Sequence, residues 1–204
     1  MKKSEESRKT YNKKASNYDN TYEGKVTQPL KQMLFNIIKV QPNQTVLDVA
    51  CGTGSLIAAL SKKANIHAYG IDIAEEMIKI ANEIYESISF TVAPAYPLMF
   101  DSSSIDIVIV SAAFHHFENP TAFVDECYRV LKAGGIVYIG EFNIPAFFRL
   151  ISNALFPFLK TGDVKLYSEI ELSSIFTKAM FKVSDIHKKG SYMIMAFEKP
   201  ADCQ

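Results

Sequence analysis

Residues 46–56 (VLDVACGTGSL) place an aspartate, Asp48, just before a loop of small residues that contains Gly52 and Gly54. Glycine lets a ligand approach the backbone closely and adopts backbone angles that other residues avoid. The residues after Gly54 have a helical pattern, and the first turn of a helix leaves backbone N–H groups unpaired. The stretch therefore predicts a ligand-binding turn between a strand and a helix.

Three kinds of ligand compete for such a turn. A phosphate-binding P-loop requires a lysine that this loop lacks, and a dinucleotide fingerprint requires a third glycine where the chain has Ile57. Asp48 would repel a pyrophosphate, but it suits a cationic amine. The loop thus favours a nucleoside without phosphates, and an NAD-dependent oxidoreductase stays as the weaker alternative.

A second acidic residue, Asp72, ends the next predicted strand in YGIDIAEEM. A carboxylate at this place can accept hydrogen bonds from both ribose hydroxyls, each worth about 1.5–3 kcal/mol. The alternative is structural: Gly52 and Gly54 make a tight turn, and Asp72 caps the helix that follows. The matched spacing of both features favours the nucleoside.

The elements that must position these residues alternate along the chain after residue 41. Strands that alternate with helices imply a parallel sheet with helices on both faces, and a Gly-containing connection makes the last two strands antiparallel. The sequence therefore predicts an α/β fold, a doubly wound, Rossmann-like, mostly parallel seven-stranded sheet with an antiparallel edge strand and a ligand beyond the carboxyl ends of the strands. The predicted strands are Thr45–Val49, 67–71, Ser89–Val92, 105–110, 136–142, 182–187 and Tyr192–Glu198, and the predicted helices are 27–39, 54–63, 74–85, 120–131 and 169–177.

The composition narrows the class of protein. The 204 residues include 22 Lys+Arg and 22 Asp+Glu, so the formal net charge is zero, which argues against a nucleic-acid binder. The N-terminus lacks an apolar signal region, and the longest apolar stretch, residues 107–117, is too short to span a bilayer. Cys51, Cys127 and Cys203 form no metal-binding spacing. We therefore expect a cytoplasmic protein with reduced thiols, no metal site and no stable membrane insertion.

Four motifs in order, VLDVACGTG, GIDIAEEMI, LMFDSSSIDIVIVSAAFHHF and RVLKAGGIVYIGEF, resemble those of class I S-adenosylmethionine-dependent methyltransferases, closest to the group that acts on small molecules. The resemblance is strong from residue 45 to about residue 142 and weak in the tail. It implies S-adenosyl-L-methionine as cofactor, S-adenosyl-L-homocysteine as product and a small-molecule methyl acceptor.

The resemblance also implies where the cofactor binds. Its methionine end would lie on the loop after the first strand, Asp72 would hold the ribose, and the ring of the adenine would pack by Ile73 and Met77. Tyr11 and Tyr18, in YNKKASNYD, resemble an N-terminal segment that closes over the cofactor. The full set of cofactor-binding residues expected is Tyr11, Tyr18, Asp48, Ala50, Cys51, Gly52, Thr53, Gly54, Asp72, Ile73, Met77, Ala95, Tyr96, Ser111 and Ala112.

Two positions depart from the pattern of the group. Ala50 replaces the first glycine of the loop, a change that we expect to cost little. Pro94 replaces an aspartate that would bind the adenine amino group, so we expect weaker cofactor affinity by about 1–2 kcal/mol, the scale of one lost charged hydrogen bond.

Methyl transfer from a sulfonium is an in-line displacement that depends mainly on alignment and exclusion of water. A general base is needed only for a protonated nucleophile, and His115 and His116 are the catalytic candidates because they follow a central strand. The alternative is that the pair only shapes the pocket. Glu141, at the end of the fifth strand, either orients the substrate or serves the structure, and a nucleophilic Cys51 is not expected.

Two segments lie outside the motifs. We expect a helical cap at 1–40, whose first 14 residues form a basic, partly mobile arm. A single domain follows at 41–204, and it carries a helical insert at about 143–162. The insert is Phe-rich, and its apolar stripe predicts a helix packed on the sheet; as an apolar lid it would offer Phe148 and Phe156 to a hydrophobic acceptor. Either segment offers a homodimer contact. The alternative from another class is a non-catalytic module that binds the cofactor or its product and acts through a partner.

Overall fold

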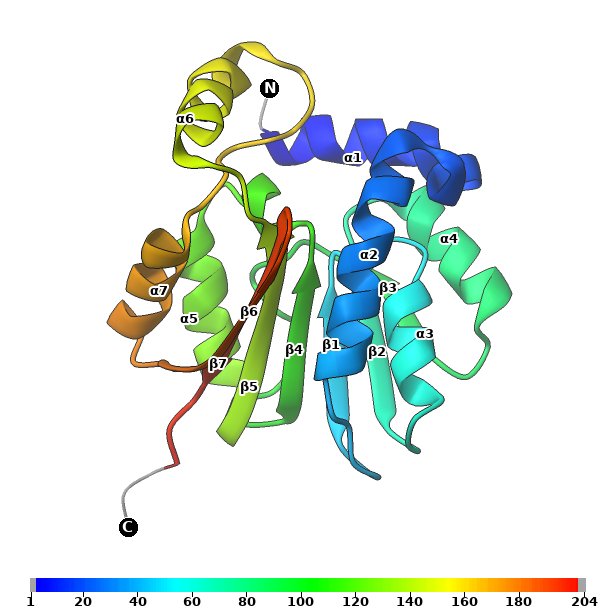
Figure 1. Cartoon of the computed structure of the whole chain (residues 1–204). Coiled ribbons are helices and arrows are strands. Elements are labelled where there is room, and N and C mark those ends of the chain that lie inside the picture. The colour runs from blue at the N-terminus through cyan, green and yellow to red at the C-terminus, as the bar shows by residue number, and fades with distance from the viewer. Residues whose placement is uncertain (1–2, 202–204) are drawn as a thin grey trace.

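The computed structural model describes residues 3–201 and contains one sheet of seven strands in the order β3-β2-β1-β4-β5-β7-β6 (Figure 1). All neighbouring pairs are parallel except β5–β7 and β7–β6, which are antiparallel, as the sequence predicts for the edge. The order reverses between β1 and β4, which makes the carboxyl ends of these two strands the expected place for a ligand. The strands are β1 (Thr45–Val49), β2 (His67–Asp72), β3 (Ser89–Val92), β4 (Ile105–Ser111), β5 (Leu131–Phe142), β6 (Lys182–Lys189) and β7 (Tyr192–Glu198).

Helices cover both faces of the sheet because the central strands are apolar on both sides. The β4 side chains alternate between two buried clusters: Val108 and Val110 pack with α5 and α7, whereas Ile107 and Ile109 pack with α2, α3 and α4. The covering helices are α2 (Tyr22–Ile37), α3 (Ser55–Ser61), α4 (Glu75–Ile84), α5 (Pro120–Val130) and α7 (Glu169–Lys178). The prediction of a doubly wound fold is confirmed.

The N-terminal segment has a regular structure that the sequence analysis did not assign. Residues 3–14 form a helix, α1 (Lys3–Lys14), that crosses above the carboxyl ends of the strands (Figure 1), and the partial mobility of this basic segment stays a prediction. A 3₁₀ turn, η1 (Ala15–Asn20), leads into α2, which begins at Tyr22 rather than at residue 27 because the Thr21 hydroxyl accepts a hydrogen bond from Gly24 N at 3.1 Å.

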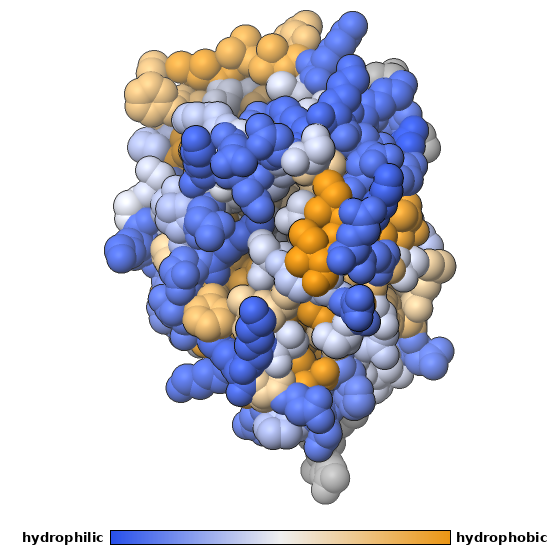
Figure 2. Space-filling model, turned by 90° about the vertical axis from the view of Figure 1, so that its right-hand side faces the viewer, coloured by the Kyte–Doolittle hydropathy of each residue, from blue (hydrophilic) through white to orange (hydrophobic). Residues whose placement is uncertain are grey.

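The Phe-rich insert forms α6 (Ala146–Leu155) and the short turn η3 (Phe156–Phe158), but it does not pack on the sheet. None of the residues of α6 is buried, and Phe147 and Leu150 each expose 68% of their surface. Helix α6 stands at the top of the molecule beside α1, and Figure 2 shows hydrophobic side chains at this height. The expectation that the stripe packs on the sheet is therefore wrong.

Among residues 3–201, no helix combines the length and the apolar character that crossing a membrane requires. Cys51 and Cys127 are buried free thiols, and Cys203 lies outside the described residues.

Candidate functional site

A cavity of about 290 Å³ lies at the carboxyl ends of β1, β2 and β4, beneath α1 and η1. This is the position that the reversal of the strand order predicts, and the volume is close to the lower end of common ligand pockets. Its walls are Ser4, Ser7, Tyr11, Tyr18, Thr27, Lys31, Asp48, Ala50, Cys51, Gly52, Leu56, Asp72, Ile73, Met77, Ala93, Pro94, Ala95, Tyr96, Ser111, Ala112, Ala113, His116, Phe117 and Glu118.

The two glycines of the loop after β1 have different roles. Gly52 has φ +56°, and within the described part of the chain nothing lies within 4 Å of the place that a Cβ would take, so its backbone is open to a ligand in the cavity. Gly54 has φ +77°, and a Cβ there would meet the Phe90 ring at 2.5 Å. Gly54 is therefore required by packing, and it does not line the cavity.

Two alanines at the cavity adopt the left-handed backbone conformation. Ala50 follows β1 with φ +57°, and Ala112 follows β4 with φ +51°. A side chain with a Cβ is strained in this region by about 1–2 kcal/mol, and such strain gathers at functional sites. Position 50 therefore has a backbone angle that favours glycine, and the expectation that alanine costs little there stays a prediction.

Asp48 is the least solvated charged group of the cavity. Its residue is 1% exposed, and its Oδ1 atom has no hydrogen-bond partner in the described structure. Burial raises the pKa of the Asp48 carboxyl to about 7, against the opposing effect of the Lys31 ammonium. A buried, unpartnered carboxylate is costly, so this side chain fits a ligand that brings a cationic donor.

Lys31 supplies positive charge to the same wall. It comes from α2, its Nζ donates to Ser55 Oγ at 3.0 Å, and it lies 5.8 Å from the centre of the Tyr18 ring. Sequence reasoning missed Lys31, because one lysine in an amphipathic helix gives no sign of the cavity that the fold builds beside it.

Asp72 lines the cavity and also organises the backbone around it. One carboxylate oxygen accepts from Gly52 N at 2.8 Å and the other from Ala74 N at 2.8 Å. Burial raises the pKa of Asp72, and these backbone hydrogen bonds oppose the shift. Asp72 thus fixes the loop after β1 and the turn before α4, but in the described structure it does not cap α4 as the structural alternative expected, because the N-cap residue is Ala74 and it has no side-chain cap hydrogen bond. Asp72 also lines the cavity, and each of its oxygens has a further lone pair.

The roof of the cavity joins α1 to the turn η2 (Phe114–His116). Tyr11 OH lies 3.0 Å from His116 Nε2, and the Tyr11 ring packs edge-on against the His116 ring and in a tilted contact with Tyr18. Burial raises the pKa values of both tyrosines, so their hydroxyls remain protonated. Both tyrosines line the cavity, and their closing over a cofactor stays a prediction.

The two histidines differ in their surroundings. His116 borders the cavity, and burial together with the neighbouring His115 lowers the pKa of His116 to about 4. His115 does not line the cavity. Its Nδ1 lies 3.0 and 2.9 Å from the two carboxylate oxygens of Glu141. Burial opposes the charged imidazole, yet the carboxylates of Glu141 and Asp163 raise the pKa of His115 above its ordinary value.

Most of the predicted cofactor residues meet at this one cavity. The exceptions are Thr53 and Gly54, which do not line it. Of the two predicted catalytic residues, His116 lines the cavity, whereas His115 faces Glu141. Cys51 lines the cavity, but burial raises the pKa of its thiol well above the ordinary value, which agrees with the expectation that it is no nucleophile. Neither Phe148 nor Phe156 lines the cavity, although the lid interpretation assigned them to the acceptor.

The reversed strand order, the glycine loop after β1 and Asp72 at the end of β2 are those of the class I S-adenosylmethionine-dependent methyltransferases. Residues 47–139 match the family model described as methyltransferase domain.

Relatives with this domain include a demethylmenaquinone methyltransferase from Chlorobaculum tepidum, 38% identical over 100 residues that cover 49% of this chain and 41% of that protein. The ubiquinone/menaquinone biosynthesis C-methyltransferase UbiE of Geotalea daltonii is 33% identical over 135 residues, 62% of this chain and 57% of that protein. The chain thus spans about half the length of the curated relatives that it matches.

Solved structures show the same fold at low sequence identity. A chain of the complex between the Haloferax volcanii Trm112 methyltransferase activator and a methyltransferase has a TM-score of 0.81 at 19% identity, over 93% of this chain and 97% of that one. The [4+2]-cyclase SpnF has a TM-score of 0.73 at 16% identity, over 85% of this chain and 80% of that one. These similarities show the fold alone.

Proposed function

We propose that this protein transfers a methyl group from S-adenosyl-L-methionine to a small apolar acceptor. The observation that carries the proposal is the pairing of opposite charges on one cavity wall, beside the open backbone of Gly52. Asp48 offers a buried carboxylate without a partner for its Oδ1 in the described structure, and Lys31 brings an ammonium group from α2. A zwitterionic amino acid matches this pair, with its ammonium on Asp48 and its carboxylate on Lys31.

The remaining walls fit the rest of the cofactor. Asp72 lies one strand away, where it would bind the ribose hydroxyls, and Ile73 with Met77 continues the wall toward α4. Pro94 and Ala95 follow β3 on the same side, so the adenine would pack there without the carboxylate that other members of the group use. We retain the expectation of an affinity lowered by about 1–2 kcal/mol at this place.

For the acceptor we propose an aromatic hydroquinone that is methylated at a ring carbon. Two kinds of support exist: relatives are named demethylmenaquinone methyltransferase and quinone biosynthesis C-methyltransferase, and the cavity continues along Tyr96, Ala113 and Phe117 with apolar surface. The displacement requires the sulfonium methyl group and the nucleophilic carbon to lie in line, a little over 3 Å apart. Such alignment can lower the activation free energy by about 7–11 kcal/mol. His116 is the histidine at the cavity, and we propose that it contacts the acceptor.

The first test is calorimetric titration of the full chain with S-adenosylmethionine, S-adenosylhomocysteine and NADH. We expect both sulfur ligands to bind and NADH to be silent. Lys31→Met, which keeps the apolar stem, should weaken both sulfur ligands by on the order of tenfold, as expected for one charged hydrogen bond. Binding of NADH alone would contradict the proposal.

Turnover with a short-chain demethylmenaquinol as acceptor then tests the reaction. A matched control is Lys79→Met on the exposed side of α4, which should change neither binding nor turnover. Methylated product from wild type supports the proposal. Tight binding of S-adenosylmethionine with no methyl transfer to any hydroquinone would favour a second candidate function. This candidate is a non-catalytic module that binds the cofactor and acts through a partner. Pro94, which lines the cavity where the group has an aspartate, is the observation that keeps this candidate. Cytoplasmic location and a homodimer remain predictions from the sequence.

A further inference from the structure

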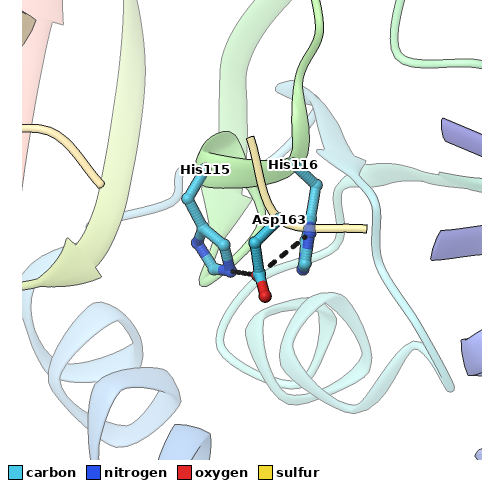
Figure 3. A group of neighbouring side chains, drawn as sticks. All are labelled: His115, His116 and Asp163. Carbon is cyan, nitrogen blue, oxygen red and sulfur yellow. Dashed lines mark ion pairs between the residues drawn. The ribbon is translucent and has the colours of Figure 1, made fainter. Parts of the chain in front are cut away.

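Three side chains at the edge of the cavity point nitrogen and oxygen atoms at one another. They are His115 and His116 of η2 and Asp163 of the segment after η3, and one potential ligand atom of each lies within 4.8 Å of the others (Figure 3). Asp163 Oδ1 is 3.5 Å from His115 Nε2 and 3.4 Å from His116 Nδ1. The carboxylate therefore lies between the two imidazoles.

The arrangement leaves an unsatisfied nitrogen. His116 Nδ1 is buried and has no hydrogen-bond partner in the described structure, while its Nε2 is taken by Tyr11 OH. His115 Nδ1 faces the carboxylate of Glu141, so its Nε2 is the nitrogen left for another partner. A histidine whose second nitrogen is held by a carboxylate is the common form of a metal ligand, because that contact fixes the tautomer and the orientation of the ring.

The backbone holds the three residues in place. The carbonyl oxygen of His115 accepts from Val164 N at 2.9 Å and from Lys165 N at 3.1 Å, which fixes the segment with Asp163 against η2. On the other side of Asp163, the Gly162 carbonyl accepts from Ser7 Oγ of α1 at 3.3 Å. The side chain of Asp163 is 20% exposed and those of His115 and His116 are 8% and 12% exposed, so the group is largely shielded from water.

We propose that His115 Nε2, His116 Nδ1 and Asp163 Oδ1 form a binding site for a divalent transition metal, with Zn²⁺ as the best fit. Ligands at about 2.0–2.1 Å around a tetrahedral Zn²⁺ lie about 3.3–3.4 Å apart, close to the two distances from Asp163. Imidazole nitrogens suit Zn²⁺, whereas Mg²⁺ and Ca²⁺ prefer oxygen ligands. Three protein ligands leave the fourth position to an oxygen donor, either water or a hydroxyl of the molecule in the cavity.

The site is made of protein atoms alone, so its existence does not depend on the proposed methyl transfer. It places a cation beside His116, which borders the cavity, and uses the nitrogen of His116 that faces away from Tyr11. This site could not be predicted from the sequence, because the expectation of no metal rested on cysteine spacing and Asp163 is distant from the histidine pair along the chain.

The test is titration of ZnCl₂ into the full chain without a histidine tag, after removal of metals with a chelator. Wild type should bind one Zn²⁺ per chain, and Asp163→Asn, which keeps the shape of the side chain, should weaken binding by at least about tenfold. The matched control is Asp185→Asn, since Asp185 also contacts a histidine, His187, on exposed β6. This control should bind Zn²⁺ as wild type does.

Absence of Zn²⁺ binding by wild type, or equal binding by wild type and a folded Asp163→Asn variant, would overturn the proposal. If Asp163→Asn does not fold, the visible absorption spectrum of wild type loaded with Co²⁺ tests the site instead. Strong visible absorption, typical of four-coordinate Co²⁺, that disappears on addition of one equivalent of Zn²⁺ would support the site. Absence of this absorption would refute the site.

Discussion

Asp48 illustrates at the scale of one residue how a binding function lowers stability. Its carboxylate lies inside the protein with one oxygen unpaired within the described residues, although an apolar or amide side chain would cost less there. A cationic ligand that pairs with this carboxylate would offset the cost of its burial. The unliganded protein then carries a cost that appears in its stability as a function of pH.

The first prediction concerns Asp48→Asn. Because burial raises the folded-state pKa from 3.8 to about 7, the folded state binds the proton more tightly than the unfolded state, so wild-type stability falls as pH rises between these values. Asn cannot ionise and escapes this loss. Chemical denaturation should show the variant about equal to wild type at pH 4 and more stable by about 2–4 kcal/mol at pH 8.

The same variant should bind S-adenosylmethionine at least about tenfold more weakly, since it loses the charged partner of the ammonium group. Asp185→Asn on exposed β6 serves as a control for the removal of one charge. A stability difference between Asp48→Asn and wild type that does not change from pH 4 to pH 8 would show that the carboxyl is not held in its neutral form.

The second prediction concerns the strained backbone at Ala50. Glycine adopts φ +57° without the Cβ penalty, so Ala50→Gly should raise the free energy of unfolding by about 1 kcal/mol at pH 7. Ala58→Gly, in the middle of α3, is the matched control and should lower it by a similar amount, because helical glycine is unfavourable. Thermal or urea unfolding measures both, and destabilisation by Ala50→Gly would contradict the strain argument.

At the scale of elements, the strands follow from local sequence patterns, whereas the positions of α1 and α6 do not. Short apolar runs such as IDIVIV define β4 because both of its faces are buried. Periodicity shows that residues 146–155 are an amphipathic helix, but it does not show what the apolar stripe faces, and here it faces outward.

The same limit applies to the site. The place of the loop after β1 and of Asp72 at the cavity could be predicted because it follows from residue types at fixed spacing at the ends of neighbouring strands. Lys31 and Asp163 could not be predicted, since each becomes part of the site through contacts between segments distant in the chain. The order of α1 has the same origin: its partners are Glu75, Glu118 and the segment 156–162.

The third prediction tests the exposure of α6. Phe147→Ser, Leu150→Ser and Leu155→Ser combined remove large apolar side chains that are already 51–68% exposed. The free energy of unfolding should therefore change by only about 0.5 kcal/mol per site or less. Phe123→Ala in α5 is the buried comparison and should cost about 3–5 kcal/mol. A loss of comparable size from the triple variant would show that α6 packs against the rest of the protein.

At the scale of the whole molecule, α1 bridges the two halves of the fold above the cavity. On one side Arg8 pairs with Glu75 of α4, and Asn12 Nδ2 donates to Glu75 Oε2 at 2.6 Å. On the other side Lys3 Nζ donates to the carbonyl oxygens of Phe156 and Leu159 at 2.9 and 2.5 Å (Figure 1). Because Tyr11 of the same helix lines the cavity, the position of α1 and the affinity for a ligand beneath it must be coupled.

Gly162 is a place at which this coupling can be tested, because Gly162 does not itself line the cavity but contacts Ser7 of α1, which does. It has φ +86°, and a Cβ there would lie 2.1 Å from Ser7 Oγ and 2.7 Å from Ser7 N, so Gly162→Ala must push α1 away from the segment 156–162. Gly190→Ala is the matched control: Gly190 also has a positive φ, +56°, but within the described structure nothing lies within 4 Å of its Cβ position.

The two variants share the backbone strain of about 1 kcal/mol, and only Gly162→Ala disturbs the contact with α1. We therefore expect Gly162→Ala to unfold at a lower temperature than Gly190→Ala, and only Gly162→Ala to bind S-adenosylmethionine more weakly, on the order of tenfold, because the tyrosines above the cofactor shift with the helix. Calorimetric titration of the two variants measures the difference. Equal affinities for the cofactor would mean that α1 covers the cavity without taking part in binding, so that the roof and the site behave as separate parts of the molecule.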